Sequence, residues 1–99
     1  MARPKDSPGH SILSKVCHAY DVPIREVLSP SRRHRCTPAR TAYTALMRHY
    51  GYDYTHIANM LNRSQVASAR YWIMLHGDFM ATNVRYALTY NTLLRTLWD

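Results

Sequence analysis

The segment from Thr37 to Gly51 constrains the fold of this chain more than any other. Thr37 is a favourable residue for a helix N-cap and Pro38 suits the first helical position. Gly51 can adopt the left-handed conformation that commonly ends a helix. Between these ends, apolar residues recur at the spacing of one helix face: Ala39, Ala42, Tyr43, Leu46, Met47 and Tyr50. The sequence therefore predicts a long core helix with a polar outer face that carries Arg40, Thr41, Arg48 and His49.

Two shorter helices are predicted before this segment. An amphipathic helix over residues 11–20 follows from apolar residues at four-residue intervals, which are Ile12, Val16 and Tyr20. Asp21 is the expected cap of a short helix that opens at Pro23 and runs through Leu28. Residues 1–8 lack any such periodicity, so we expect a flexible N-terminal arm followed by one domain over residues 9–99.

Three more helices are predicted after Gly51. Asp53 is the expected cap of a short helix through Leu61, and Ser64 is the expected cap of a longer helix that reaches about His76. Gly77 and Asp78 should break that helix. A last helix over roughly residues 79–97 should bury some of Val84, Ala87, Leu88, Leu94 and Trp98. No strand pair is predicted, so the expected fold is an all-α bundle of about six helices.

A cluster of arginines precedes the long helix. Lys and Arg number 13 against 6 Asp and Glu, which gives a formal net charge of +7. Four arginines fall between residues 32 and 40: Arg32, Arg33, Arg35 and Arg40. The guanidinium group keeps its charge in proteins and matches phosphate oxygens and guanine edges. This clustering predicts a nucleic-acid partner, with a solvated charged loop as the alternative.

The short helix, the turn at Asn62 and Arg63, and the longer helix after it have the order of a helix-turn-helix. In that motif the start of the second helix meets base edges in the major groove. We therefore expect Arg63 to suit guanine and Gln65 to suit adenine. The other residues expected at this surface are Ser64, Val66, Ala67 and Arg70. Arg40, with Thr41 and Arg48 on the same outer face, is expected to contact phosphates.

The sequence contains little that predicts catalysis. The six carboxylates form no spaced acid–base pair and the histidines lack metal-ligand spacing, so no enzyme activity, cofactor or metal is expected. Cys17 and Cys36 are too few for a disulfide scaffold. Cys36 is either a spectator or a redox-sensitive thiol beside arginines. No apolar stretch is long enough to span a membrane, and no secretory signal precedes the domain. We expect a cytoplasmic protein of the nucleoid.

The order of these features resembles the C-terminal DNA-binding domain (domain IV) of the bacterial replication initiator DnaA, over about residues 11–97. The matching motifs are Val16-x-x-x-Tyr20, Val27-Leu28-Ser29, Arg32-Arg33-x-Arg35, Pro38-Ala39-Arg40, Leu46, Ile57-Ala58 and Asn62-Arg63. The resemblance implies a Trp-repressor-like helical fold. It also implies that Arg33, with Arg32 or Arg35 as alternatives, enters the minor groove, that Arg40 contacts the backbone, and that Arg63 opens the reading helix.

The chain departs from this family at the positions that read bases. Ser64-Gln65-Val66-Ala67 stands where the family has Asp-His-Thr-Thr, and Arg70 stands where it has His. The sequence therefore predicts a target other than the family's usual box. The nucleotide-binding Gly-x-x-x-x-Gly-Lys-Ser/Thr motif is absent, so no nucleotide partner is expected.

Two classes of function follow from the sequence. The first is sequence-specific binding of double-stranded DNA without catalysis, as a small transcriptional regulator or, as a variant, a replication-linked origin binder. The second is a protein-interaction module that binds or inhibits a replication or transcription partner. The second reading uses the last helix, where Tyr86, Tyr90, Leu93 and Leu97 are expected to form an apolar patch for a protein partner or a homodimer.

Overall fold

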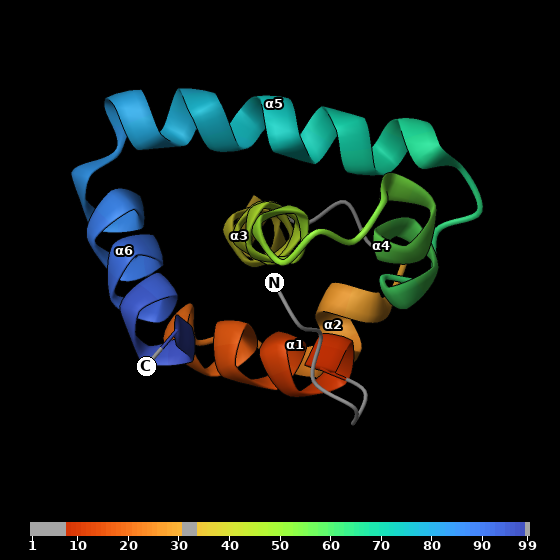
Figure 1. Ribbon diagram of the computed structural model, residues 1–99, viewed down its shortest axis with the longest axis horizontal. Coiled ribbons are helices and arrows are strands. Elements are labelled where there is room, and N and C mark those ends of the chain that lie inside the picture. The colour runs from red at the N-terminus through yellow and green to blue at the C-terminus, as the bar shows by residue number, and fades with distance from the viewer. Residues whose placement is uncertain (1–7, 31–33, 99) are drawn as a thin grey trace.

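The computed structural model describes residues 8–30 and 34–98, and its regular structure in these ranges is helical throughout (Figure 1). The elements are α1 (Pro8–Ala19), α2 (Ile24–Leu28), the 3-10 turn η1 (His34–Cys36), α3 (Thr37–His49), α4 (Tyr54–Met60), α5 (Val66–Thr82) and α6 (Val84–Trp98). The predicted all-α bundle of about six helices is confirmed. Among the described residues no helix is long and apolar enough to cross a membrane. The predicted N-terminal arm lies almost wholly outside the described residues.

The helix α3 lies in the middle of the molecule, where Figure 1 shows it end-on, and it contacts α1, α5 and α6. Its predicted apolar face is confirmed, but residues 39–47 are buried on all sides. The prediction that Arg40 and Thr41 face outward is wrong, because they are only 4% and 0% exposed. Arg48 and His49, in the last turn, are exposed as predicted. A helix surrounded by others has no solvent face until it leaves the bundle.

The first two helices differ from the prediction at their ends. α1 begins at Pro8, before the predicted start. Of the predicted stripe, Ile12 and Val16 are buried and Tyr20 is half-buried, and the neighbouring Leu13 and Cys17 are buried beside them. The prediction that Asp21 caps α2 is wrong: Pro23 holds the N-cap position, and no side chain caps it. Asp21 instead has φ +57° and turns the chain out of α1. Aspartate is one of the few residues that tolerate this left-handed conformation.

The helix ends predicted at Gly51 and Asp53 are confirmed, but the one predicted at Thr37 differs. Gly51 has φ +95° directly after the C-terminal residues of α3, and the Asp53 side chain accepts the backbone N–H of His56 at 2.8 Å to cap α4. The start of α3 differs, because Thr37 is its first helical residue and Cys36 holds the N-cap position. The turn η1 leads directly into α3 and shifts its start by one residue.

The helix α5 continues through Gly77 and Asp78 to Thr82, so the predicted break at these residues is wrong. Glycine in a helix costs about 1 kcal/mol relative to alanine. Packing offsets that cost, because Trp72 is buried and Leu75, Phe79 and Met80 lie against the core on both sides of Gly77. The turn occurs at Asn83, whose side chain accepts the N–H of Tyr86 at 3.0 Å as α6 begins.

The face of α6 that packs against the core differs from the predicted one. Tyr86, Tyr90 and Leu93 are buried and Leu97 is partly buried, so they do not form the predicted apolar patch. Of the residues among which buried ones were expected, Val84 and Leu88 are 75% and 63% exposed, and Ala87 and Leu94 are half-buried. Tyr86 and Tyr90 are aromatic, so turning them inward buries more apolar area than turning Val84 and Leu88 inward would. They also find polar partners: His76 Nδ1 lies 2.8 Å from the Tyr86 hydroxyl, and Tyr20 donates to the Tyr86 carbonyl at 3.2 Å.

Candidate nucleic-acid interface

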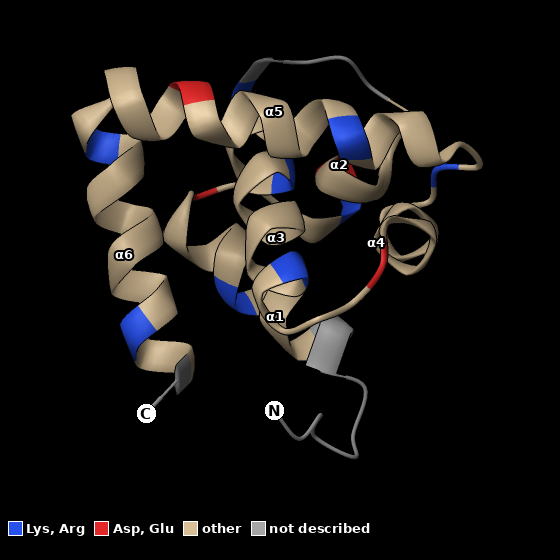
Figure 2. Cartoon of the chain, turned by 45° about the horizontal axis from the view of Figure 1, so that its top comes forward, with Lys and Arg blue, Asp and Glu red and all other residues tan. Residues whose placement is uncertain are grey.

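The elements α4 and α5 have the order of the predicted helix-turn-helix, and Figure 2 shows α4 end-on while α5 runs across the view. Asn62 supplies the turn with φ +58°, and the Arg63 N–H donates to the Ala58 carbonyl at 2.8 Å. Gln65, rather than the predicted Ser64, holds the N-cap position of α5, and no side chain caps it. The first N–H groups of α5 therefore lie at the end of the helix where an anion is favoured.

Four of the predicted reading residues lie on the surface at the start of α5. Ser64, Gln65, Ala67 and Arg70 are exposed, and Val66 is half-buried. Sequence reasoning missed two neighbours on this helix, Tyr71 and Met74, which are 54% and 58% exposed. Their spacing of four and seven residues from Ala67 places them on the same side of α5 and could have identified them.

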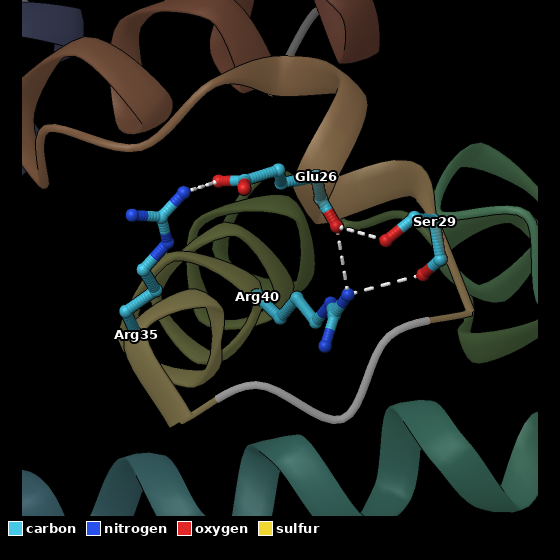
Figure 3. Close-up of polar contacts among 4 residues, drawn as sticks. All are labelled: Glu26, Ser29, Arg35 and Arg40. Carbon is cyan, nitrogen blue, oxygen red and sulfur yellow. Dashed lines mark hydrogen bonds and ion pairs between the residues drawn. The ribbon is translucent and has the colours of Figure 1, made fainter.

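The Arg40 side chain holds the end of α2 instead of facing solvent (Figure 3). Its Nε donates to the Val27 carbonyl at 3.0 Å, and one terminal nitrogen donates to the carbonyls of Glu26 at 3.0 Å and Ser29 at 3.1 Å. These carbonyls belong to the last turn of a helix, where a cation is favoured. Burial, together with the nearby positive charge of Arg63, lowers the pKa of Arg40. This geometry makes Arg40 a structural residue of the domain.

The predicted guanine reader Arg63 also has partners within the domain. Its guanidinium donates to the carbonyls of Ser29 at 2.9 Å and Leu61 at 3.2 Å, and lies 5.7 Å from the centre of the Trp72 ring. Asn62 donates to the Leu28 carbonyl at 3.4 Å. The turn before α5 is therefore bonded to the end of α2, which directly precedes the arginine-rich segment of residues 32–40.

The remaining arginines of that segment divide into two groups. Arg35 is exposed and forms an ion pair with Glu26, as Figure 3 shows. Arg32 and Arg33, two of the alternatives for the minor-groove arginine, lie outside the described residues. The chain on both sides of them is fixed, by the bonds of Arg40 and Arg63 to Ser29 on one side and by η1 on the other.

Two predicted DNA-binding arginines that are far apart in the sequence meet at one aromatic ring. The guanidinium carbons of Arg48 on α3 and Arg70 on α5 lie 4.5 Å and 5.8 Å from the centre of the Tyr54 ring on α4. Arg48 also donates to the Tyr52 carbonyl at 2.9 Å. Aromatic rings attract cations at such distances, so Tyr54 can hold two like charges near each other. This arginine pair lies beside the exposed start of α5.

A cleft of about 810 Å³ lies between α5, the turn before it and the start of α3. Its walls include the polar groups of Arg40, Arg63 and Ser64, while Tyr71 and Trp72 provide aromatic surface. The cleft thus adjoins three of the predicted site residues. It borders the arginine-rich segment at Pro30.

Neither a metal site nor a reactive thiol is found among residues 8–30 and 34–98. No group of three or more His, Cys, Asp or Glu in these ranges could hold a metal ion. Cys17 and Cys36 are free thiols, and both are buried. Burial raises the pKa of Cys17 to about 11, which keeps that thiol protonated at neutral pH. Full burial of Cys36 favours the spectator alternative, since oxidation needs access to solvent.

Comparisons with protein-family models, with curated proteins and with solved structures find no match to this chain. The resemblance to domain IV of DnaA stays a prediction from the sequence motifs.

Proposed function

We propose that this protein binds double-stranded DNA through α4 and α5, without catalysis, and acts as a small transcriptional regulator. The observation that carries the proposal is the position of Gln65, Ala67 and Arg70, exposed at the start of α5 and flanked by the arginine pair on Tyr54. A reading helix needs exposed donors, acceptors and methyl groups at its N-terminus, with fixed cations beside them for phosphates.

Within this proposal the residues have separate tasks. Ser64, Gln65 and Ala67 face the base edges, with the Val66 side chain at their margin. Arg48 and Arg70 contact phosphates, and the arginine-rich segment before α3 lies along the adjacent minor groove. Arg40 and Arg63 hold the end of α2 and so fix the position from which that segment starts.

The resemblance to DnaA domain IV supports the same function with another target. Because the base-reading positions carry Ser64-Gln65-Val66-Ala67, the proposed protein prefers sites other than the initiator's box. A replication-linked origin binder is the variant of this proposal. A place in the nucleoid would follow from either form.

The first experiment is a selection from a random duplex DNA library with the purified full chain, followed by sequencing of the bound pool. We expect a defined motif that differs from the initiator's box, and its symmetry would distinguish a monomer from a dimer. Affinity should also fall steeply with salt, because each phosphate contact releases a counterion. A folded protein that enriches no sequence would overturn the proposal of specific reading.

A second candidate function, a protein-interaction module, is favoured by one observation. Four large apolar side chains are exposed, at Tyr71, Met74, Val84 and Leu88, on α5 and α6. Weak DNA binding with little dependence on salt would favour this function over the first.

A further inference from the structure

A groove of about 670 Å³ runs between α1 and α6. In Figure 1 this corner of the molecule lies diagonally opposite the turn between α4 and α5. Lys15 and His18 of α1 form one wall, and Leu88, Thr89, Thr92 and Thr96 of α6 form much of the other. The proposed DNA surface includes none of these residues.

The α6 wall of the groove is apolar despite its threonines. The Thr89, Thr92 and Thr96 hydroxyls donate to carbonyls four residues earlier in α6, at 2.9, 2.9 and 2.8 Å. Their hydrogens are therefore used inside the helix, and their methyl groups are left to line the groove. Leu88 adds a side chain that is 63% exposed. When a partner covers a large apolar side chain in such a groove, the burial of apolar surface lowers the free energy of the complex.

The two helices that form the groove carry charges of one sign, while Asp21, just beyond α1, lies in the adjoining pocket with Thr89 and Arg85. The α1 and α6 sequences contain no Asp or Glu, whereas they carry Lys15, Arg85 and Arg95. Two copies packed through this groove would bring these cations together, and like charges oppose association. A duplex would gain little from methyl groups and Leu88. The observations favour an occupant that is apolar on one side and acidic at its edges.

We propose that the groove between α1 and α6 binds an amphipathic, acidic helix of another protein. The stretch from Leu88 to Thr96 covers about 12 Å of helix, which matches two turns of a partner helix. Apolar residues at positions i and i+4 of that helix would cover Leu88 and the threonine methyl groups. Carboxylates beside them would face Lys15 and His18. This proposal does not rest on the proposed DNA binding.

The test uses the isotope-labelled full chain and two designed peptides of about five turns, or 18 residues. Both peptides carry leucines on one helix face, and the opposite face carries glutamates in one peptide and lysines in the other. We expect the glutamate peptide to shift the amide signals of Lys15, Leu88 and Thr92 in nuclear magnetic resonance spectra. The lysine peptide should leave these signals unchanged.

Two variants distinguish binding in the groove from nonspecific hydrophobic binding. Leu88→Glu should weaken binding of the glutamate peptide by about tenfold or more, as expected for a central apolar contact. Met74→Glu is the matched control, because Met74 is 58% exposed on α5 and lies outside the groove walls. Both positions are exposed, so both variants should keep the circular dichroism spectrum of the parent.

Three results would overturn the proposal. The amide shifts could map to another surface, or Leu88→Glu and Met74→Glu could weaken binding equally. Sedimentation could also show that the parent is a dimer that Leu88→Glu dissociates, which would assign the groove to a second copy of the chain. None of these results depends on whether the protein binds DNA.

Discussion

At the scale of single residues, the buried arginine decides how the arginine-rich segment is presented. Arg40 is the last arginine of that segment; its side chain is buried in the bundle and bonds to three carbonyls at the end of α2. A lysine could not reach three acceptors in this arrangement, because its donors share one nitrogen. The position therefore requires the guanidinium geometry.

Arg40→Ala should lower the free energy of unfolding by about 2–3 kcal/mol, since hydrogen bonds from a charged donor would be lost in a buried place. Denaturant unfolding followed by tryptophan fluorescence measures the change. Arg35→Ala is the control, because Arg35 is exposed and its one ion pair with Glu26 should contribute little. Equal stability of the Arg40→Ala protein and its parent would contradict the structural role.

His76 predicts how stability depends on pH. Burial lowers the pKa of this imidazole below its ordinary value of 6.5. The unfolded chain then binds more protons than the folded chain as the pH falls below about 6.5, so the free energy of unfolding should decrease from pH 7 towards pH 5. Urea unfolding at a series of pH values measures this slope.

His76→Gln should flatten that slope, because it removes the buried titrating group while leaving a side chain that can bond to the Tyr86 hydroxyl. His18→Gln makes the same substitution at an exposed position and is the matched control. A His76→Gln protein with the full slope would assign the effect to other groups.

At the scale of helices, the chain shows which ends a sequence can predict. Gly51 and Asp53 act through their own backbone and nearest neighbours, so local rules were sufficient there. Gly77 and Asp21 were misread because the outcome depends on contacts made elsewhere. The core on both sides of Gly77 keeps α5 continuous, and Asp21 could serve either the exit from α1 or the entry to α2.

Gly77→Ala should raise the free energy of unfolding by about 0.5–1 kcal/mol, because alanine has less conformational freedom to lose in a helix. A Cβ atom added at residue 77 would meet nothing within 4 Å. Gly51→Ala should instead lower the free energy of unfolding, since a φ of +95° strains any residue with a side chain. Thermal unfolding should move the two midpoints in opposite directions, and a lower midpoint for Gly77→Ala would contradict the continuous α5.

At the scale of the whole molecule, the sequence predicted the type of candidate site but only some of its residues. The sequence identified the turn and the exposed residues that follow it, because the order of the helices and the turn residues between them are local features. Arg40 and Arg63 were assigned to DNA from their charge and from their places at the starts of predicted helices. The burial of Arg40 and the bonds of both residues to the end of α2 depend on how α2, α3 and α5 meet, which no spacing in the sequence encodes.

The arginine pair on Tyr54 gives a test of the proposed interface as a whole. Arg48→Ala and Arg70→Ala should each weaken binding to all duplexes and reduce the salt slope by about one. Arg95→Ala removes the same charge from α6 and should leave that slope unchanged. Gln65→Ala should instead alter preference at one base position by about 1–3 kcal/mol. Equal losses on every sequence would exclude Gln65 as a reader; fluorescence anisotropy with labelled duplexes measures both effects.

The unbroken course of α5 has a thermodynamic consequence. Gln65 stands at one end of this helix, and the other end turns directly into α6, whose side chains line the groove. With no break at Gly77, there is no joint in the helix at which the two ends could move independently. If a ligand in the groove changes the association constant for DNA by some factor, bound DNA must change the association constant for that ligand by the same factor.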